Sequence, residues 1–259
     1  MTLPSDLKQF INDNLKQDIN TLALKKNPFP DFEWSWILNQ IQAKQKAEKK
    51  LPTWFANDDV IFPSTLSIEQ TSSETLAKFK SELISGEKLI DLTGGFGVDD
   101  FYFAKRFKKI VHCEFQDDLS AIVQHNFKVL KTDNIETISG DSISYLEKSI
   151  EKFDWIYIDP ARRDDKKTKV FLLKYCTPNV VELHDLLFEK SDNILIKAAP
   201  LLDISSILNE LSNVKTIYAI GLQNEVKELL IVLQKGFIGQ PELIAVNISN
   251  DNTIHQDIF

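Results

Sequence analysis

A glycine-rich loop has the residue types and spacing to bind a charged ligand. Gly94, Gly95 and Gly97, three of the eight glycines in the chain, follow a short apolar run that carries Asp91 near its end, and Thr93 opens the loop. Glycine permits positive φ and lets a ligand touch the backbone. A helix that begins behind such a loop offers free N–H groups to an anion. The loop therefore predicts a site for a phosphate or an amino-acid carboxylate.

The spacing of this loop indicates which ligand it suits. A dinucleotide-binding loop needs Gly-x-Gly-x-x-Gly, and Asp100 stands where the third glycine would be. The pattern Asp91-x-Thr93-x-Gly95-x-Gly97 instead resembles the acidic-x-Gly-x-Gly-x-Gly loop of class I S-adenosylmethionine (SAM) methyltransferases, with Thr93 in place of the first glycine. This resemblance implies SAM as cofactor, bound by Asp91 and by the loop residues Thr93, Gly94, Gly95 and Gly97. For the motif alone, an ordinary strand–helix turn is the alternative.

Acids at the ends of the next two expected strands complete the cofactor site. A ribose diol needs an acidic acceptor, which lies about 20 residues further on in a related fold, and Glu114 ends the run 109–114. The adenine amine needs an acceptor after the third strand, where Asp141 and Ser142 stand. Acids at strand ends are common, so each residue alone has a structural alternative. Their order along the chain favours cofactor binding.

A second motif, Asp159-Pro160-Ala161-Arg162, lies at the end of the fourth expected strand. It resembles the Asp/Asn-Pro-Pro-x motif that lies beside the transferred methyl group in many nucleic-acid and amino-group methyltransferases. The resemblance implies that Asp159 accepts a hydrogen bond from the substrate nucleophile and that Pro160 stiffens the loop. Catalysis would then consist mostly of placement.

Basic residues near this motif are expected to contact the substrate. The chain has three arginines among its 30 basic residues, and Arg162 and Arg163 are adjacent here. A guanidinium fork suits phosphate or carboxylate, so we expect Arg162 or Arg163 to hold a substrate phosphate. Lys197 and Asn224 are expected to line the pocket. A solvated loop is the alternative.

The two cysteines do not favour covalent catalysis. Asp-Pro-Pro-Arg occurs in some RNA methyltransferases with a cysteine nucleophile, which needs a reactive thiol near the site. Cys113 lies inside an expected strand, and Cys176 lies beyond the motif loop. We therefore expect direct methyl transfer without a covalent enzyme intermediate.

Short apolar runs that alternate with helical patterns must position these motifs. Because the alternation is typical of α/β proteins, it predicts a parallel, doubly wound sheet with ligands at the carboxyl ends of its strands. Only residues 221–228 separate the last two runs, which is too few for a crossover helix, so these runs must form an antiparallel hairpin. The prediction is a Rossmann-like class I methyltransferase sheet. The expected strands are 88–91, 109–114, 134–138, 155–159, 193–197, 216–220 and 229–233.

We expect three segments along the chain. Residues 1–62 form a small helical N-terminal domain with apolar stripes over 5–24 and from Trp34 onward. Residues 63–236 form the methyltransferase domain, whose first helix spans about 71–85 with Thr71 or Ser72 as N-cap. Residues 237–259 contain one more strand, which either pairs with the main sheet or begins a further domain.

The aromatic and basic residues of the N-terminal segment have two interpretations. Trp34, Trp36 and Trp54 form a small core or pack on the next domain. In the alternative, an exposed aromatic and the neighbouring lysines make a substrate-binding surface; these are Lys44, Lys46, Lys49 and Lys50.

Composition excludes several classes of function. The net charge of −8 and pI of about 5.1 argue against broad nonspecific nucleic-acid binding, although not against a local basic groove. Two cysteines without a His/Cys cluster predict no zinc site, and no metal is expected. No basic leader or membrane-length apolar run is present, so we expect a cytoplasmic protein.

Longer stretches resemble a group of bacterial methyltransferases with a helical N-terminal section and a C-terminal THUMP-like domain. The matching stretches are 66–74, 91–99, 159–164, 196–200 and 224–229. The resemblance implies RNA as substrate, although this chain, ending at Phe259, is expected to lack the THUMP-like module. We therefore predict a SAM-dependent methyltransferase acting on RNA (tRNA or rRNA). The alternatives are a small-molecule or protein methyltransferase and a non-catalytic module that binds SAM and RNA.

Overall fold

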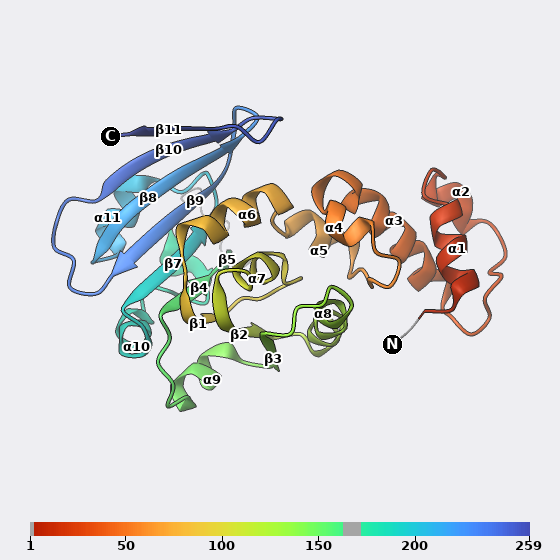
Figure 1. Ribbon diagram of the computed structural model, residues 1–259, viewed down its shortest axis with the longest axis horizontal. Helices are drawn as coiled ribbons and strands as arrows, with labels where there is room; N and C mark the ends of the chain where they lie inside the picture. Colours follow the sequence, from red (N-terminus) through yellow and green to blue (C-terminus); the bar gives the residue numbers. More distant parts are fainter. Residues whose placement is uncertain (1–2, 163–171) are drawn as a thin grey trace.

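The computed structural model describes residues 3–162 and 172–259, and its centre is a nine-stranded mixed sheet (Figure 1). The strand order across the sheet is β11-β10-β8-β9-β7-β4-β1-β2-β3. The strands are β1 (Gly86–Asp91), β2 (Phe107–Glu114), β3 (Ile135–Ser139), β4 (Trp155–Ile158), β7 (Asn193–Ala198), β8 (Val214–Leu222), β9 (Glu225–Gln234), β10 (Glu242–Ile248) and β11 (Ile254–Ile258).

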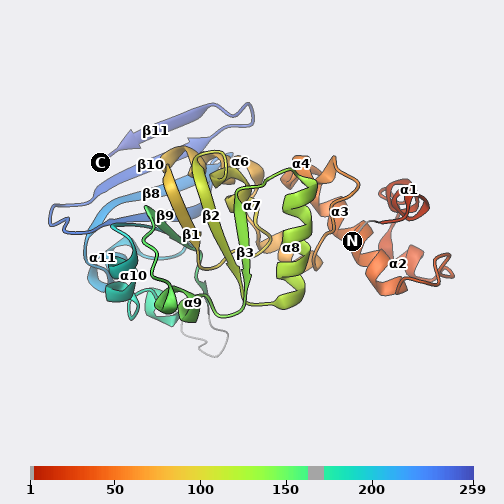
Figure 2. The same cartoon turned by 60° about the horizontal axis from the view of Figure 1, so that its bottom comes forward.

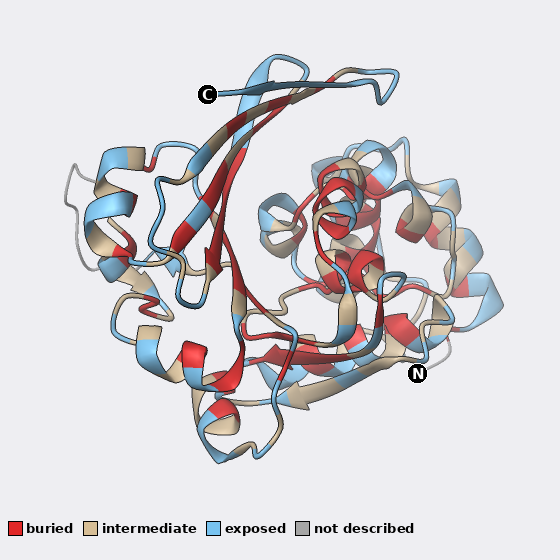
Figure 3. Ribbon diagram, turned by 60° about the vertical axis from the view of Figure 1, so that its left-hand side comes forward, coloured by how far each residue is buried: buried red, intermediate tan, exposed pale blue. Residues whose placement is uncertain are grey.

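The sheet confirms the predicted α/β class and its antiparallel hairpin. Strands β3, β2, β1, β4 and β7 are parallel neighbours, and β9 runs antiparallel to both β7 and β8. The hairpin turn consists of Gln223 and Asn224, both with positive φ, as tight two-residue hairpins require. Every predicted strand is present, and the central strands are largely buried, whereas the edge strand β3 is only partly buried (Figure 3).

Helices cover both faces of the sheet (Figure 2). Helices α6 (Glu74–Leu83), α7 (Val98–Phe103) and α8 (Asp117–Val129) pack on one face, through Leu76, Phe103 and Phe127 among others. Helices α9 (Ser142–Lys148), α10 (His184–Lys190) and α11 (Ile204–Glu210) pack on the other, through Leu146, Leu187 and Ile207. The carboxyl ends of the parallel strands therefore stay uncovered by these helices.

The N-terminal segment is helical, and its tryptophans are partly divided between two cores. The elements are α1 (Ser5–Asp13), α2 (Ile19–Ala23), α3 (Trp34–Lys50), α4 (Pro52–Phe55) and α5 (Thr65–Gln70). Trp34 and Trp36 pack against the small core of α1–α3. Trp54 is 1% exposed and lies 4.9 Å from Phe101 and 6.3 Å from Phe96 between ring centroids. This aromatic contact ties the N-terminal segment to the glycine loop and α7.

Several local expectations differ from the structure. The N-cap of α6 is Ser73, whose Oγ accepts the Leu76 N–H, rather than Thr71 or Ser72. The segment expected as one helix over 5–24 breaks between α1 and α2, where the Asp18 side chain caps α2. Strand β10 pairs in parallel with β8, so the strand expected after residue 237 belongs to the main sheet. Strand β11 and a two-stranded antiparallel ribbon were not predicted. The ribbon pairs β5 (Ala161–Arg162) with β6 (Cys176–Thr177), and the short 3₁₀ helix η1 (Leu173–Tyr175) directly precedes β6.

Candidate active site

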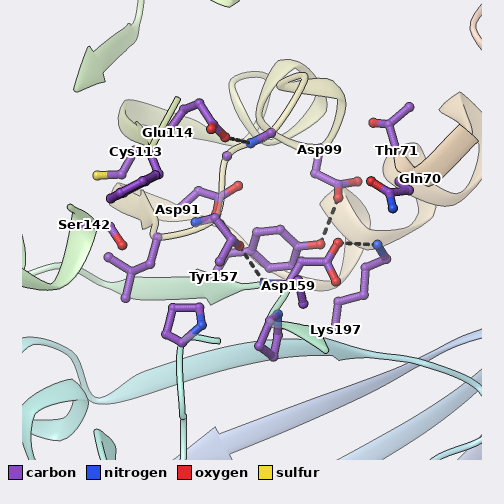
Figure 4. A pocket seen from close by; sticks show the side chains of 18 of the residues that line it. Gln70, Thr71, Asp91, Asp99, Cys113, Glu114, Ser142, Tyr157, Asp159 and Lys197 are labelled. Carbon is purple, nitrogen blue, oxygen red and sulfur yellow. Dashed lines mark hydrogen bonds and ion pairs between the residues drawn. The ribbon is translucent and has the colours of Figure 1, made fainter. Parts of the chain in front are cut away.

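A cavity of about 1070 Å³ lies at the carboxyl ends of β1, β2, β3, β4 and β7. In Figure 4, Glu114 and Cys113 lie toward one end of this cavity and Lys197 toward the other, with Tyr157 between them. The cavity is lined by predicted site residues from both motifs: Asp91, Thr93, Gly94, Gly95, Glu114, Asp141, Ser142, Asp159, Pro160, Arg162 and Lys197. The fold thus brings nearly all of the predicted site together. Arg163 lies outside the described residues.

Close packing explains two of the loop glycines. A Cβ on Gly94 would lie 2.2 Å from the His112 ring, and the Gly94 N–H donates to the Cys113 carbonyl at 2.8 Å. Gly97 has φ +75°, and a Cβ there would lie 2.6 Å from the Phe127 ring. Gly97 is the N-cap of α7 and is not among the residues lining the cavity. Its positive φ and the close Phe127 ring require glycine at this position, and its expected cofactor contact stays a prediction.

Thr93, the departure from the glycine pattern, links the two motifs. Its Oγ1 donates to Asp91 Oδ1 at 3.0 Å and accepts the Asp159 N–H at 2.7 Å. Burial, together with the nearby charge of Asp100, raises the pKa of the Asp91 carboxyl well above its usual value. The loop therefore fixes the backbone of Asp159 through one hydroxyl, a contact that local sequence does not reveal.

Two backbone N–H groups hold the Glu114 side chain in place at the end of the cavity formed by β2. Its two carboxylate oxygens accept the N–H groups of Gly95 at 3.0 Å and Gln116 at 2.8 Å. The adjacent Phe115 also lines the cavity and is 77% exposed, although it is a large apolar residue. Sequence reasoning missed Phe115; its signal was an aromatic residue directly after the acid that ends β2. An exposed ring here offers a flat face on which a purine can stack.

Asp141 has a structural role at the third strand end. It caps α9, accepting the Ile143 N–H at 3.0 Å and the Ser144 hydroxyl at 2.8 Å. These hydrogen bonds, that of Ser144 first, lower the pKa of Asp141, so the carboxylate is ionised at neutral pH. A carboxylate has about four lone-pair sites, so capping leaves acceptor capacity toward the cavity.

Asp159 and Lys197 form an ion pair at the opposite end (Figure 4). The Lys197 side chain is only 14% exposed. Burial lowers the pKa of Lys197, but the carboxylates of Asp159, Asp99 and Glu228 raise it further, so the net shift is upward. Lys197 therefore stays protonated and cannot act as a base, and its ammonium group lies against the Asp159 carboxyl.

A buried polar network of Lys80, Asp99, Glu228 and Tyr157 lies next to this ion pair. Lys80 is fully buried, and its Nζ lies 3.1 Å from both Asp99 and Glu228. The Tyr157 hydroxyl donates to Asp99 at 2.8 Å. Burial raises the pKa of Asp99, but Lys80 and then Lys197 lower it more strongly, so the group remains charged. No local sequence pattern predicts this network, because Lys80 looks like an ordinary exposed lysine on a helix.

The remaining candidates have clear positions. Arg162 lines the cavity from β5 and pairs in register with Cys176 of β6. The Cys176 thiol contacts the Leu172 carbonyl at 3.8 Å. Burial raises the pKa of Cys113, so its thiol is a poor nucleophile. Asn224 Oδ1 instead accepts a hydrogen bond from the side-chain amide of Asn247 in β10 at 2.7 Å. The Cys113 thiol is thus not activated for attack.

No protein-family profile matches the chain. The chain is 32% identical over 111 residues to a tRNA (uracil(54)-C(5))-methyltransferase of Pyrococcus horikoshii, covering 40% of this chain and 26% of that protein. It is 27% identical over 175 residues to an uncharacterised RNA methyltransferase of Mycoplasma mobile, covering 65% of this chain and 47% of that protein. The chain thus spans less than half the length of these two curated relatives.

Solved structures share the whole architecture. A crystal structure of a putative methyltransferase from Porphyromonas gingivalis W83 has a TM-score of 0.84 and 27% identity, over 100% of this chain and 66% of that one. An O-methyltransferase from Bacillus cereus in complex with SAH has a TM-score of 0.52 and 13% identity, over 89% of this chain and 97% of that one. The fold is that of the Rossmann-like methyltransferases. This confirms the predicted fold class, including its antiparallel hairpin.

Residues 3–162 and 172–259 contain neither a candidate metal site nor a candidate membrane-spanning helix. No group of three or more His, Cys, Asp or Glu side chains there could hold a metal ion. Over the same residues, no helix is long and apolar enough to cross a membrane.

Proposed function

We propose that this chain is a SAM-dependent RNA methyltransferase that transfers the methyl group directly to its substrate. One observation carries the proposal: the glycine loop and the Asp159–Lys197 pair line the same cavity, and the Thr93 hydroxyl joins them by accepting the Asp159 N–H. A cofactor seated along the loop would place its reactive end toward Asp159. Of the three curated relatives, one is named a tRNA methyltransferase and two are named RNA methyltransferases. These names support RNA as the substrate class.

The residues of the first cavity fit the three parts of SAM. Gly95 and the Asp91 carboxyl suit its amino-acid end, and Glu114 suits the ribose diol. Phe115 offers stacking for adenine, with Asp141 and Ser142 as neighbouring polar groups. When bound, SAM supplies an electrophilic methyl group on a sulfonium.

The chain's own residues orient the substrate. Asp159 accepts a hydrogen bond from the nucleophile's N–H or O–H, and the Thr93 hydroxyl fixes the Asp159 backbone. Lys197 pairs with the Asp159 carboxyl and offers a donor to a neighbouring substrate acceptor. Arg162 and Arg163 hold a substrate phosphate, with Pro160 restricting the loop that carries them. Direct transfer agrees with the protonated state of the Cys113 thiol.

The finer parts of the proposal concern the substrate and its setting. The resemblance to the bacterial THUMP-like-domain methyltransferases, like the names of the curated relatives, supports tRNA or rRNA. An RNA-modifying role also fits a cytoplasmic protein, which we retain as part of the proposal. We also retain the proposed segments 1–62, 63–236 and 237–259, the last now contributing strands to the main sheet.

Calorimetry and a transfer assay together test the proposed function. We expect the purified protein to bind SAM and SAH, and to transfer a labelled methyl group to RNA from cells that lack the gene. Asp159→Ala is expected to retain SAM binding and lose transfer, whereas Asp192→Ala, a control whose side chain is 77% exposed, retains both. Absence of binding heat from folded protein overturns the cofactor assignment. Transfer to a small molecule or protein but never to RNA overturns the substrate class.

A further inference from the structure

A second cavity of about 530 Å³ opens from the substrate end of the first. The two cavities share six lining residues: Gln70, Thr71, Ser72, Lys197, Lys227 and Glu228. The residues that line the second cavity come from the end of α3, the α5–α6 junction, the β8–β9 turn and the β10–β11 turn. Lys197 therefore borders both the proposed transfer site and this neighbouring space.

Most of the residues that line the second cavity are polar, with Leu76 and Leu222 among them as apolar residues. The cavity wall carries the hydroxyl groups of Ser73 and Thr75 and the amides of Gln223, Asn250 and Asn252, besides the shared residues. None of the described residues that line it is aromatic. Hydroxyls and amides of this kind contact phosphate and sugar in nucleic-acid complexes, whereas bases need stacking surfaces. The composition suits a nucleic-acid backbone better than a second base.

Positive charge predominates in this cavity. Four lysines line it (Lys49, Lys50, Lys197 and Lys227), against two acids. Both acids are already paired, Glu228 with buried Lys80 and Glu69 with Lys46. Lys197 pairs with Asp159, and Lys227 with Glu225 at 2.6 Å. Lys49 and Lys50 are in no ion pair among the described residues.

Lys50 is held rigidly at the cavity wall. Its Nζ donates to the carbonyls of Ile68 at 2.9 Å and Glu69 at 2.6 Å, at the last turn of α5. Burial, and then the charge of Lys197, lowers the pKa of Lys50 to about 8. The two ammonium groups thus repel each other across the cavity. A bound anion would relieve that repulsion and favour the charged form of Lys50.

We propose that the second cavity binds the phosphodiester backbone of the RNA strand next to the target nucleotide, with Lys49 and Lys50 as its phosphate contacts. The inference rests on the proposed function and adds to it the course of the bound RNA strand. The target nucleotide occupies the first cavity beside Asp159, and the adjoining backbone passes Lys197 into the second. An acidic protein of net charge −8 needs such a local cation site to hold RNA.

The test measures binding of a short, fluorescein-labelled, single-stranded RNA of mixed sequence by anisotropy over a range of salt concentrations. The variant Lys49→Gln/Lys50→Gln is compared with Lys25→Gln/Lys26→Gln, an equal charge change at two exposed residues after α2. We expect the first variant to weaken binding about tenfold, roughly threefold per lost phosphate contact, and to reduce the salt slope by about 1.4. We expect the control to stay close to the wild type.

Two further variants separate folding effects from loss of contact. Lys50→Arg keeps the charge and is expected to retain most of the RNA affinity. Lys49→Gln changes an exposed side chain on α3, so it cannot disturb the α5 carbonyls, and we expect it alone to weaken binding about threefold.

The outcomes distinguish this inference from the proposed function. If the Lys49/Lys50 variant and the Lys25/Lys26 control lose RNA affinity equally while SAM binding is intact, the second cavity is not the RNA path. Competition by poly-glutamate as strong as that by RNA would assign the cavity to an acidic protein instead and overturn the proposal. Loss of RNA affinity confined to the cavity variants, with unchanged SAM heat, supports it. A wild-type protein that fails to bind SAM refutes the proposed function itself.

Discussion

Replacing Lys80 with methionine tests the buried network behind the candidate site. Lys80 Nζ lies 3.1 Å from Asp99, 3.1 Å from Glu228 and 2.8 Å from the Ser72 hydroxyl, and its side chain is fully buried. Lys80→Met keeps the approximate length of the side chain and removes the charge. The variant leaves two carboxylates, 12% and 3% exposed, without their shared cation.

The expected loss of stability follows from this geometry. Removing one partner of a buried ion pair costs about 3–5 kcal/mol. At roughly 2–4 °C per kcal/mol for a chain of this size, the melting temperature should fall by roughly 6–20 °C. Lys197 also borders Asp99, so we expect the lower half of this range.

The loss should depend on pH in a defined direction. In the wild type, Lys80 and Lys197 outweigh burial and hold the pKa of Asp99 below its usual value. Asp99 therefore stabilises the fold above its unfolded pKa, and that contribution disappears as the pH falls through the folded pKa. In Lys80→Met the pKa of Asp99 rises and the carboxyl can take up a proton. The stability gap between the two proteins should narrow as the pH falls from about 7 toward 4.

Thermal and urea unfolding, followed by circular dichroism at several pH values, measure this gap. Lys78→Met is the matched control, because Lys78 is exposed on the same helix. We expect the control to change stability by less than about 0.5 kcal/mol. Equal losses in the two variants, or a gap that stays constant with pH, would refute the reasoning.

Three further predictions concern the two motifs and the second cavity. Thr93→Val leaves the Asp159 N–H unpaired, so we expect a loss of about 1–3 kcal/mol in urea unfolding and slower methyl transfer, both restored by Thr93→Ser. Gly94→Ala places a Cβ 2.2 Å from the His112 ring; we expect the free energy of unfolding to fall by about 1–3 kcal/mol and SAM binding to weaken, and wild-type stability would contradict the packing argument. Because the pKa of Lys50 is about 8, RNA affinity should fall between pH 7 and 9.5 in the wild type but less in Lys50→Arg, as anisotropy would show; identical pH profiles would count against charge at Lys50.

The sequence predicted the central strands well, because each has consecutive apolar residues that face both sides of the sheet. Leu89 with Ile90, and Ile194 with Leu195 and Ile196, are fully buried, which is typical of central strands covered on both faces. The hairpin followed from chain length, since residues 221–228 could not cross the sheet. Once the strand order was set, the polar residues at the strand ends had to converge on one edge. The positions of Glu114 and Asp159 around a common cavity follow from that topology.

What the sequence did not reveal depends on contacts between distant residues. Lys80 meets Glu228 148 positions further along the chain, and no local pattern distinguishes it from a solvated helix lysine. The Thr93–Asp159 contact spans 66 positions, so Thr93 looked like a tolerated departure from a motif. The cap of α6 was misplaced because three hydroxyl residues, 71–73, stand in a row and only the backbone angles choose between them. The close approach of Gly97 to Phe127 and Val123 of α8 also depends on the tertiary fold, so the loop motif alone does not show it.

The contact between Trp54 and the glycine loop gives the protein a built-in optical reporter. The indole ring of Trp54 is buried, and its centroid lies 6.3 Å from that of Phe96. Phe96 belongs to the glycine loop, which we expect to contact the cofactor. The emission of Trp54 should therefore be blue-shifted in the native state and respond when that loop rearranges. Occupancy of the methyl-donor compartment could then be followed in dilute solution, without dye or isotope.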